Sequence, residues 1–241
     1  AIGGRVELGS VAANSRVSLN PVAAGWQLGY EAVSAFQDIR LLNTASIDTS
    51  GAGAGAIHLQ GRSIFVRDGS GLVAFNLGSQ PSDPITLRAT DLVELSGFDA
   101  AQNYQSSILA KVNPGASGQG SDIDVQADRL QLLDGGIISG ATLGAGDAGS
   151  LTVRASEVTI QGGRFRIETL PNGKMEENVD ASNLETQVTP SGTGRGGDVL
   201  VEADRLLVSD RAGLASGTFG AGDSGNVTIR ARESVEVSNA A

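Results

Sequence analysis

The sequence predicts an all-β chain folded as a right-handed parallel β-helix, a solenoid with three strands per coil and a base period of about 28 residues. Three observations support this fold class. Glycine contributes 34 of 241 residues while aromatic residues make up only 4%, a composition typical of short strands joined by tight turns. No window carries the 3.6-residue apolar period of a long amphipathic helix. Six segments also repeat one pattern.

The six repeated segments fix the period. They start at Ile57, Ile85, Ile123, Leu151, Val199 and Val227, so successive starts are 28, 38, 28, 48 and 28 residues apart. The second and fourth copies therefore carry insertions of 10 and 20 residues. A period in this range is typical of stacked repeat architectures.

Within each copy the pattern predicts three strands. The first alternates apolar and polar residues, as in ITLRA from Ile85, so one face is predicted to point into the core. Its fifth residue is always glycine or alanine, which suits a bend where neighbouring coils pack closely. A second strand follows. A third ends at a large residue before glycine, at Leu77, Leu143 and Phe219.

We expect one continuous domain with two parts. Residues 57–241 are expected to form regular coils with insertions near 98–106 and 164–182. Residues 1–56 are expected to form irregular coils that carry an aromatic insertion. The chain begins without an initiator Met or signal peptide and stops before the third strand of its last repeat, so we expect a fragment of a longer protein.

The N-terminal part carries weaker copies of the same three strands. RVSLN near Arg16 is predicted as a first strand, DIRLLN near Asp38 as a second, and ASIDTS as a third. The segment between the first two is predicted to be a short irregular or helical insertion. Its Trp26, Tyr30 and Phe36 are expected to pack over the coil below.

Charge and composition exclude several classes of function. The net charge of −10 argues against a nucleic-acid partner, because such partners require a basic face. The absence of cysteine excludes disulfides and thiolate sites. No run of 18 apolar residues occurs, so no transmembrane segment is expected.

Glycine-rich motifs resemble ligand sites but fit turns better. Residues 144–149 and 220–225 match G-x-G-x-x-G, yet they precede strands, whereas a phosphate-binding turn opens a helix. Asp147 and Asp223 in these turns resemble calcium-binding nonapeptide repeats but lack the tandem copies. We therefore predict neither a cofactor nor a metal site, and expect each aspartate to cap its own turn.

Catalytic residues are not predicted either. His58 is the only histidine and is expected to face solvent, so no Ser-His-Asp triad has support. Asp68, Asp134 and Asp210 recur at one repeat position, about 9.6 Å apart on alternate coils. This spacing is at the far edge of the range for inverting glycosidases. A carbohydrate-active enzyme, either polysaccharide lyase or hydrolase, is therefore the alternative, but residues that follow a repeat usually serve the repeat.

The first strands also predict a charged ladder on the outer face. Arg154, Glu202 and Arg230 occupy one position in consecutive copies, where opposite charges would lie one strand apart.

Several segments resemble one protein family. GGRVELGSV, NPVAAGW, YEAVSAFQDIRL and ISGATLGAGDAGSLTVRASEVTI resemble the cyanobacterial filamentous-haemagglutinin-like exoproteins of the two-partner secretion system. The resemblance covers essentially the whole chain and places it just after the secretion domain. It implies a parent protein recognised by an outer-membrane β-barrel transporter and exported to the outer surface of the cell. It also implies a role in cell adhesion, aggregation or the extracellular matrix.

We therefore expect a secreted or cell-surface structural and adhesive stalk without enzymatic activity. A regular rod offers little specificity, so binding is predicted in the insertions. The candidate contact residues are Tyr104 in the first insertion and Phe165, Arg166 and Lys174 in the second, which is predicted as a β-hairpin. Expected partners are a cell-surface or matrix polysaccharide or protein. End-to-end self-association is also expected, through the uncovered last strand.

Overall fold

The computed structural model describes residues 3–22, 25–99, 101, 104–169 and 173–240, with backbone alone at 166–169 and 176–178. These residues form strands and turns and contain no helix, so the prediction of an all-β chain is confirmed.

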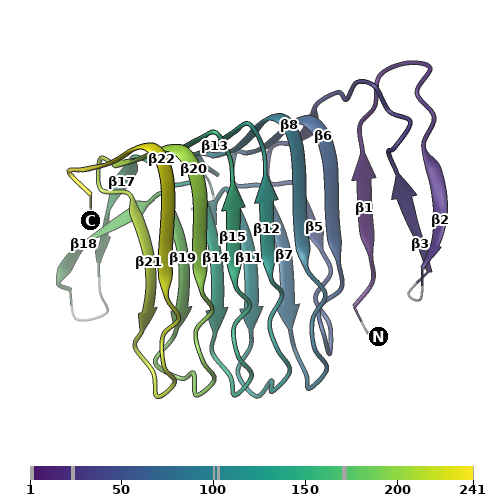
Figure 1. Cartoon of the computed structure of the whole chain (residues 1–241). Coiled ribbons are helices and arrows are strands. Elements are labelled where there is room, and N and C mark those ends of the chain that lie inside the picture. Colours follow the sequence, from purple (N-terminus) through teal and green to yellow (C-terminus); the bar gives the residue numbers. More distant parts are fainter. Residues whose placement is uncertain (1–2, 23–24, 100, 102–103, 170–172, 241) are drawn as a thin grey trace.

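Two parallel sheets lie face to face and make up the body of the molecule (Figure 1). Each repeat runs along the first sheet, turns a corner, returns along the second sheet, and enters the next repeat through a glycine-rich turn. The ten-stranded sheet contains β1 (Val6–Gly9), β4 (Ile39–Leu41), β6 (Ile57–Arg67), β8 (Ile85–Ser96), β12 (Ile123–Gln126), β13 (Arg129–Leu133), β15 (Leu151–Arg154), β16 (Glu157–Gln161), β20 (Val199–Ser209) and β22 (Val227–Ser238). The six-stranded sheet contains β5 (Ser46–Asp48), β7 (Gly71–Asn76), β11 (Ser107–Val112), β14 (Ile137–Thr142), β19 (Asn183–Val188) and β21 (Gly213–Thr218).

Residues equivalent in the repeat lie beside one another in the ten-stranded sheet. Ile57 pairs with Ile85, which pairs with Ile123, and Leu151 pairs with Val199. Steps of 28, 38 and 48 residues produce the same register because the insertions lie in the connections that lead from one sheet to the other. The predicted parallel, in-register pairing of these segments is confirmed.

The predicted fold class, a right-handed parallel β-helix with three strands per coil, is wrong. The expected first and second strands belong to one sheet, and in β6, β8, β20 and β22 they form a single strand. Between β8 and β20 two repeats are split into short strands. The pairings there close into a ring of six parallel strands, in the order β8, β12, β15, β20, β16 and β13, with β13 pairing back to β8.

The small fifth residue of the repeat explains this difference. Gly61 and Ala203 adjoin a shift of register inside β6 and β20, where the strand continues. A β-bulge at a small residue bends a strand without ending its pairing. The sequence feature that we interpreted as a corner is therefore a bulge within one sheet.

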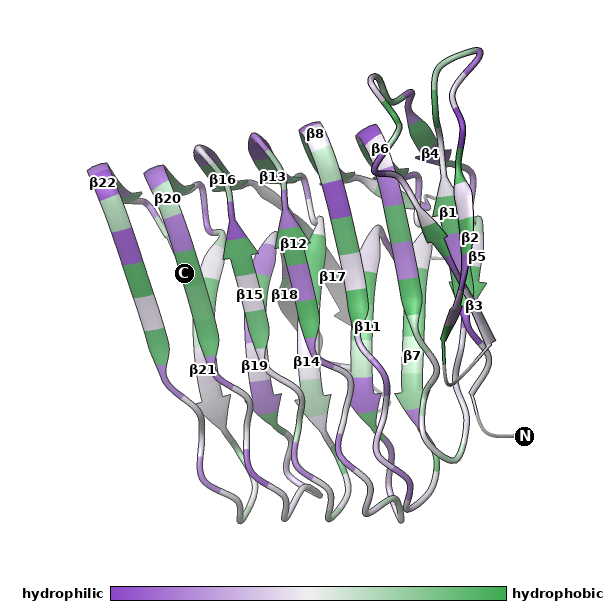
Figure 2. Ribbon diagram, turned by 45° about the vertical axis from the view of Figure 1, so that its right-hand side comes forward, coloured by the Kyte–Doolittle hydropathy of each residue, from purple (hydrophilic) through white to green (hydrophobic). Residues whose placement is uncertain are grey.

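The apolar core lies between the two sheets. Leu87 and Val125 enter it from the ten-stranded sheet, and Ile108 and Ile138 from the six-stranded sheet, and all four are fully buried. Figure 2 shows the corresponding alternation of hydrophobic and hydrophilic bands along β6 and β8. Burial of each such side chain contributes about 1.5–3 kcal/mol, so the apolar face fixes the register.

Two of the three strands predicted in the N-terminal part are confirmed. β4 pairs with Ile64–Val66 of β6, and β5 pairs with Gly71–Val73 of β7. The place beside the first half of β6 is taken by β1. The division of the chain at residue 56 stays a prediction.

The segment near Arg16 does not form the predicted first strand. Ser18–Val22 (β2) instead pairs antiparallel with Gly25–Gly29 (β3), so this insertion is a hairpin. Pro21 lacks the N–H that a central strand would donate, which suits an edge hairpin. The rings of Tyr30 and Phe36 pack 5.7 Å apart, whereas Trp26 is 58% exposed and covers no core.

The two edges of the stack differ in how the chain turns. At the corners Asp68, Asp134 and Asp210 adopt φ of 55°, 48° and 53°, a left-handed conformation that aspartate tolerates better than most residues. At the opposite edge, the bottom of Figure 1, the glycine-rich turns pack on one another. A Cβ at Gly146 would overlap the carbonyl oxygen of Gly118 in the turn beside it. The first edge therefore accommodates aspartate in its tight turns, whereas closely packed glycines of the second edge, such as Gly146, lack room for a Cβ.

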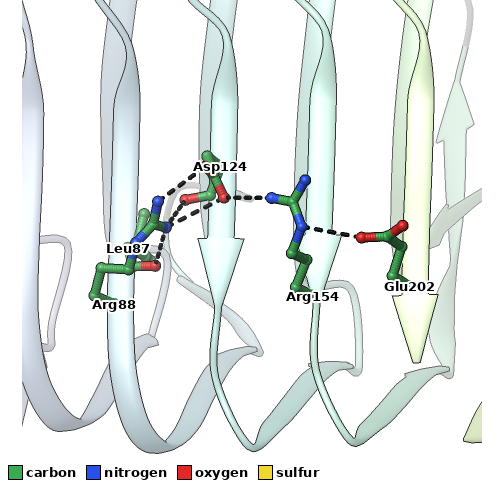
Figure 3. Close-up of polar contacts among 5 residues, drawn as sticks. All are labelled: Leu87, Arg88, Asp124, Arg154 and Glu202. Carbon is green, nitrogen blue, oxygen red and sulfur yellow. Dashed lines mark hydrogen bonds and ion pairs between the residues drawn. The ribbon is translucent and has the colours of Figure 1, made fainter. Parts of the chain in front are cut away.

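A ladder of alternating charges crosses the outer face of the ten-stranded sheet (Figure 3). Asp124 lies between Arg88, at 2.9 Å, and Arg154, at 3.7 Å. Glu202 follows, 3.0 Å from Arg154 and 2.8 Å from Arg230. The predicted ladder is confirmed and extends two strands further than expected. Hydrogen bonds from Arg230 and Arg154 hold the pKa of Glu202 below its usual value.

Candidate functional site

Both insertions leave the stack at the corner that leads from the ten-stranded to the six-stranded sheet. In the first, β9 (Phe98–Asp99) pairs antiparallel with β10 (Tyr104–Gln105). In the second, β17 (Gly163–Thr169) pairs antiparallel with β18 (Met175–Ala181), as the hairpin prediction required. The strands that follow them, β11 and β19, are separated by β14 alone.

The two insertions contact each other across this gap. The guanidinium of Arg164 lies 3.8 Å from the ring centroid of Phe98, and its Nε lies 3.2 Å from Asp180 of β18. Phe98 also covers the corner of the intervening repeat, where a Cβ at Gly135 would overlap its ring. A cation over an aromatic face adds to the packing. The insertions therefore form one surface.

Gln105 connects the same three repeats through the backbone. Its Nε2 donates to the carbonyl oxygen of Gly135 at 2.9 Å and to that of Ala181 at 3.1 Å. The side chain of one insertion thus satisfies carbonyl groups at the bases of the next corner and of the second insertion. This bridge restricts the angle at which both insertions leave the stack.

Buried serines fix the point where each insertion rejoins the stack. Ser106 donates to the carbonyl oxygen of Ser96 at 2.7 Å and accepts from the amide of Gly69 at 3.1 Å. Ser182 does the same at the second insertion, with Gln161 and Gly135. Sequence reasoning missed these residues, although a small residue directly before each strand of the six-stranded sheet was visible in the repeat.

The predicted contact residues differ in their surroundings. Tyr104 is 59% exposed and Phe165 is 48% exposed, with the guanidinium of Arg211 4.0 Å from the Phe165 ring. Lys174 is exposed near the tip of the hairpin. Arg166 pairs with Asn178 through its backbone, but its side chain lies outside the described residues. Tyr104, Phe165 and Lys174 are therefore exposed on the two insertions.

A groove that sequence reasoning did not foresee lies beside the first insertion, on the outer face of the six-stranded sheet. Tyr104 stands at one end, and Lys111 of β11 and Glu185 of β19 lie on opposite sides. Oε1 of Glu185 accepts from Ser139 and from Gln187, each at 3.3 Å. Burial raises the pKa of the Glu185 carboxyl above its usual value, and this outweighs the hydrogen bond from Ser139 and the charge of Lys111.

The other residues considered in the sequence have structural surroundings. His58 is half-buried on the outer face of β6, between Glu7 and Thr86, and burial lowers the pKa of its imidazole. Asp147 accepts a hydrogen bond from the amide of Arg195 in the next turn, so it caps its neighbour and not its own turn. Within the described ranges, no three His, Asp or Glu side chains are grouped in a way that could hold a metal ion.

The last strand exposes apolar side chains along its uncovered edge. In β22, Val235 is 50% exposed and Val237 is 63% exposed. Such an edge is a template for pairing with another chain. End-to-end self-association therefore stays a prediction.

Comparison with known proteins identifies no family: no family model, no curated protein and no solved structure matches the chain. Among the residues that the structure covers, none lies in a helix long and apolar enough to span a membrane.

Proposed function

We propose that the chain is part of a secreted or cell-surface adhesive stalk, in which the stacked sheets hold the two insertions in place for binding to a cell-surface or matrix polysaccharide or protein. In this proposal a longer parent protein reaches the outer surface through an outer-membrane β-barrel transporter, as the resemblance to two-partner secretion exoproteins implies.

The contact between the two insertions carries this proposal. Two insertions without a shared function would not be expected to contact each other. Here Arg164 packs on Phe98, and Gln105 donates a hydrogen bond to the backbone carbonyl of Ala181. Loops held on a rigid scaffold are common binding surfaces. The exposed rings of Tyr104 and Phe165 add the aromatic area that is enriched at interfaces.

The test shortens the second insertion without disturbing its base. Replacing residues 165–179 by Asn-Gly keeps Arg164 opposite Asp180 and supplies a two-residue hairpin turn. We expect the melting temperature to change little and the attachment of cells displaying the protein to fall. Phe219→Ala is the control, because Phe219 is 71% exposed but follows β21 at the glycine-rich edge. Unchanged attachment in the shortened variant would place binding elsewhere.

A carbohydrate-active enzyme is the second candidate, favoured by the groove with Lys111 and Glu185. A carboxyl with a raised pKa suits a general acid. Most glycoside hydrolases need a second carboxylate, and the series Asp68, Asp134 and Asp210 lies at the corners, where its recurrence follows from the turn conformation. The release of reducing ends or unsaturated products from polysaccharides, abolished by Glu185→Gln, would establish the enzyme and refute the adhesive proposal.

A further inference from the structure

We infer that the groove on the outer face of the six-stranded sheet binds a short segment of an uncharged polysaccharide, with Tyr104 as the platform for a sugar ring. This inference rests on the proposed adhesive function and names a ligand class and a site for it.

The groove is built by small residues between two rows of long ones. Ser139 and Ala141 point outward from β14 and are 2% and 1% exposed. Leu109 and Glu185 lie on either side of Ser139, and Lys111 and Gln187 on either side of Ala141. Two strand spacings separate the flanking rows, about 9.6 Å. The groove therefore runs along β14, between the side chains of β11 and β19.

The polar groups in the groove match a polyhydroxylated ligand. Lys111 offers donors only, Glu185 acceptors, and Gln187 and Ser139 both. These groups lie around the apolar side chain of Leu109, with the exposed Tyr104 ring at one end. A pyranose ring has apolar C–H faces and an edge of hydroxyl groups, so it can stack on the tyrosine while its hydroxyls bond to the flanking residues.

Other classes of extended ligand fit less well. A peptide that adds a strand needs free backbone groups at a sheet edge, but β14 is paired on both sides, with β11 and β19. A polyanion would be repelled by Glu185 and by the net charge of −10. A polycation would be repelled by Lys111. The charges within the groove balance, which favours a neutral chain.

The test is affinity electrophoresis of the whole chain in gels that contain one polysaccharide each. Mixed-linkage β-glucan, galactomannan and dextran serve as neutral probes, and alginate and polygalacturonate as polyuronates. We expect at least one neutral polysaccharide to retard the protein. Tyr104→Ala and Gln187→Ala should each raise the Kd by about fivefold to tenfold, because each removes one contact.

Matched controls separate binding from folding. Trp26→Ala removes an equally exposed ring, at 58% compared with 59% for Tyr104, and Gln131→Ala removes an outward glutamine from the ten-stranded sheet. Both controls should bind like the unaltered chain, and all variants should keep its melting temperature. Binding that survives in Tyr104→Ala and Gln187→Ala, retardation by polyuronates alone, or no retardation in any neutral gel would each overturn the inference.

The inference and the proposed function fail in different ways. The shortened-hairpin variant keeps the groove, so it should still be retarded by the neutral polysaccharide while its cells attach less. Retardation with unchanged attachment would refute the role of the second insertion and leave the groove assignment standing. If shortening the hairpin lowers attachment but no neutral polysaccharide retards the unaltered chain, the groove assignment is refuted and the role of the second insertion stands.

Discussion

Replacing one core leucine tests the assignment of inward and outward faces in the ten-stranded sheet. Leu132 is fully buried in β13, and its cross-strand neighbours Leu95 and Ile160 are fully buried too. Leucine-to-alanine changes in a core cost about 2.7–5.0 kcal/mol, and more where the site cannot collapse. The flanking strands are held by backbone ladders, so we expect Leu132→Ala to cost about 3–4 kcal/mol.

This loss is large enough to measure in two ways. With about 2–4 °C per kcal/mol for a chain of this size, the melting temperature should fall by about 10 °C. With a urea slope of about 3 kcal/mol/M, the unfolding midpoint should fall by about 1 M. Leu133→Ala is the control, because Leu133 points outward from the same strand and is half-exposed. Equal losses in the two variants would refute the assignment of inward and outward faces.

Three further outcomes follow from electrostatics and packing. Burial alone would raise the pKa of Glu94, but hydrogen bonds from Arg67 and Ser96 and the charge of Arg67 together hold it below its usual value. The stabilisation from Glu94 is therefore present at neutral pH and is lost as the pH falls through the folded pKa. Glu94→Gln should therefore cost about 1–2 kcal/mol at pH 7, and progressively less in urea titrations as the pH falls through the folded pKa of Glu94. Glu202→Arg places three like charges in a row and should lower the melting temperature in low salt, with a smaller effect in 1 M NaCl; an unchanged value in low salt would count against the ladder. Gly146→Ala should cost about 1–3 kcal/mol because its Cβ meets backbone, whereas Gly217→Ala, with open space, should be neutral in the same titration.

The repeat in the sequence predicted pairing, register and faces because those properties depend on a period of two. Val125 and Val153 occupy one position in consecutive copies, and they pair in the structure. The outward ladder from Arg154 to Arg230 follows from the same alternation. The alternation within a single copy separates inward from outward residues, so these predictions did not require knowledge of long-range contacts.

The number of sheets could not be read from the same pattern. A small residue such as Gly61 permits either a corner or a bulge, and the local sequence is alike in both. Whether the strand turns a corner or forms a bulge depends on how neighbouring repeats pack, and the sequence of one repeat does not specify that packing. The segment near Arg16 failed for a related reason: its alternation fits a strand of either sheet, and only Pro21 argued for an edge hairpin.

The candidate site was predicted in part, through its positions along the chain. The lengths of the insertions predicted where the two excursions leave the stack. Tyr104 and Phe165, predicted as contact residues within them, are exposed in the structure. The stacking of Arg164 on Phe98 and the groove between Lys111 and Glu185 join residues from different repeats, which no spacing in the sequence connects. Such contacts arise only when the repeats are placed side by side.

The difference between the two edges of the stack makes this molecule a one-sided scaffold for display. At the glycine-rich edge a single methyl group at Gly146 would overlap the neighbouring backbone, so foreign sequence there would wedge the repeats apart. The edge that carries the aspartate corners already tolerates a long excursion, the one between β16 and β19. Peptides grafted at Asp68 or Asp210 would emerge along the same line as the natural insertions, at intervals set by the strand spacing. An engineer could thus mount several epitopes in a fixed row while leaving the opposite edge untouched.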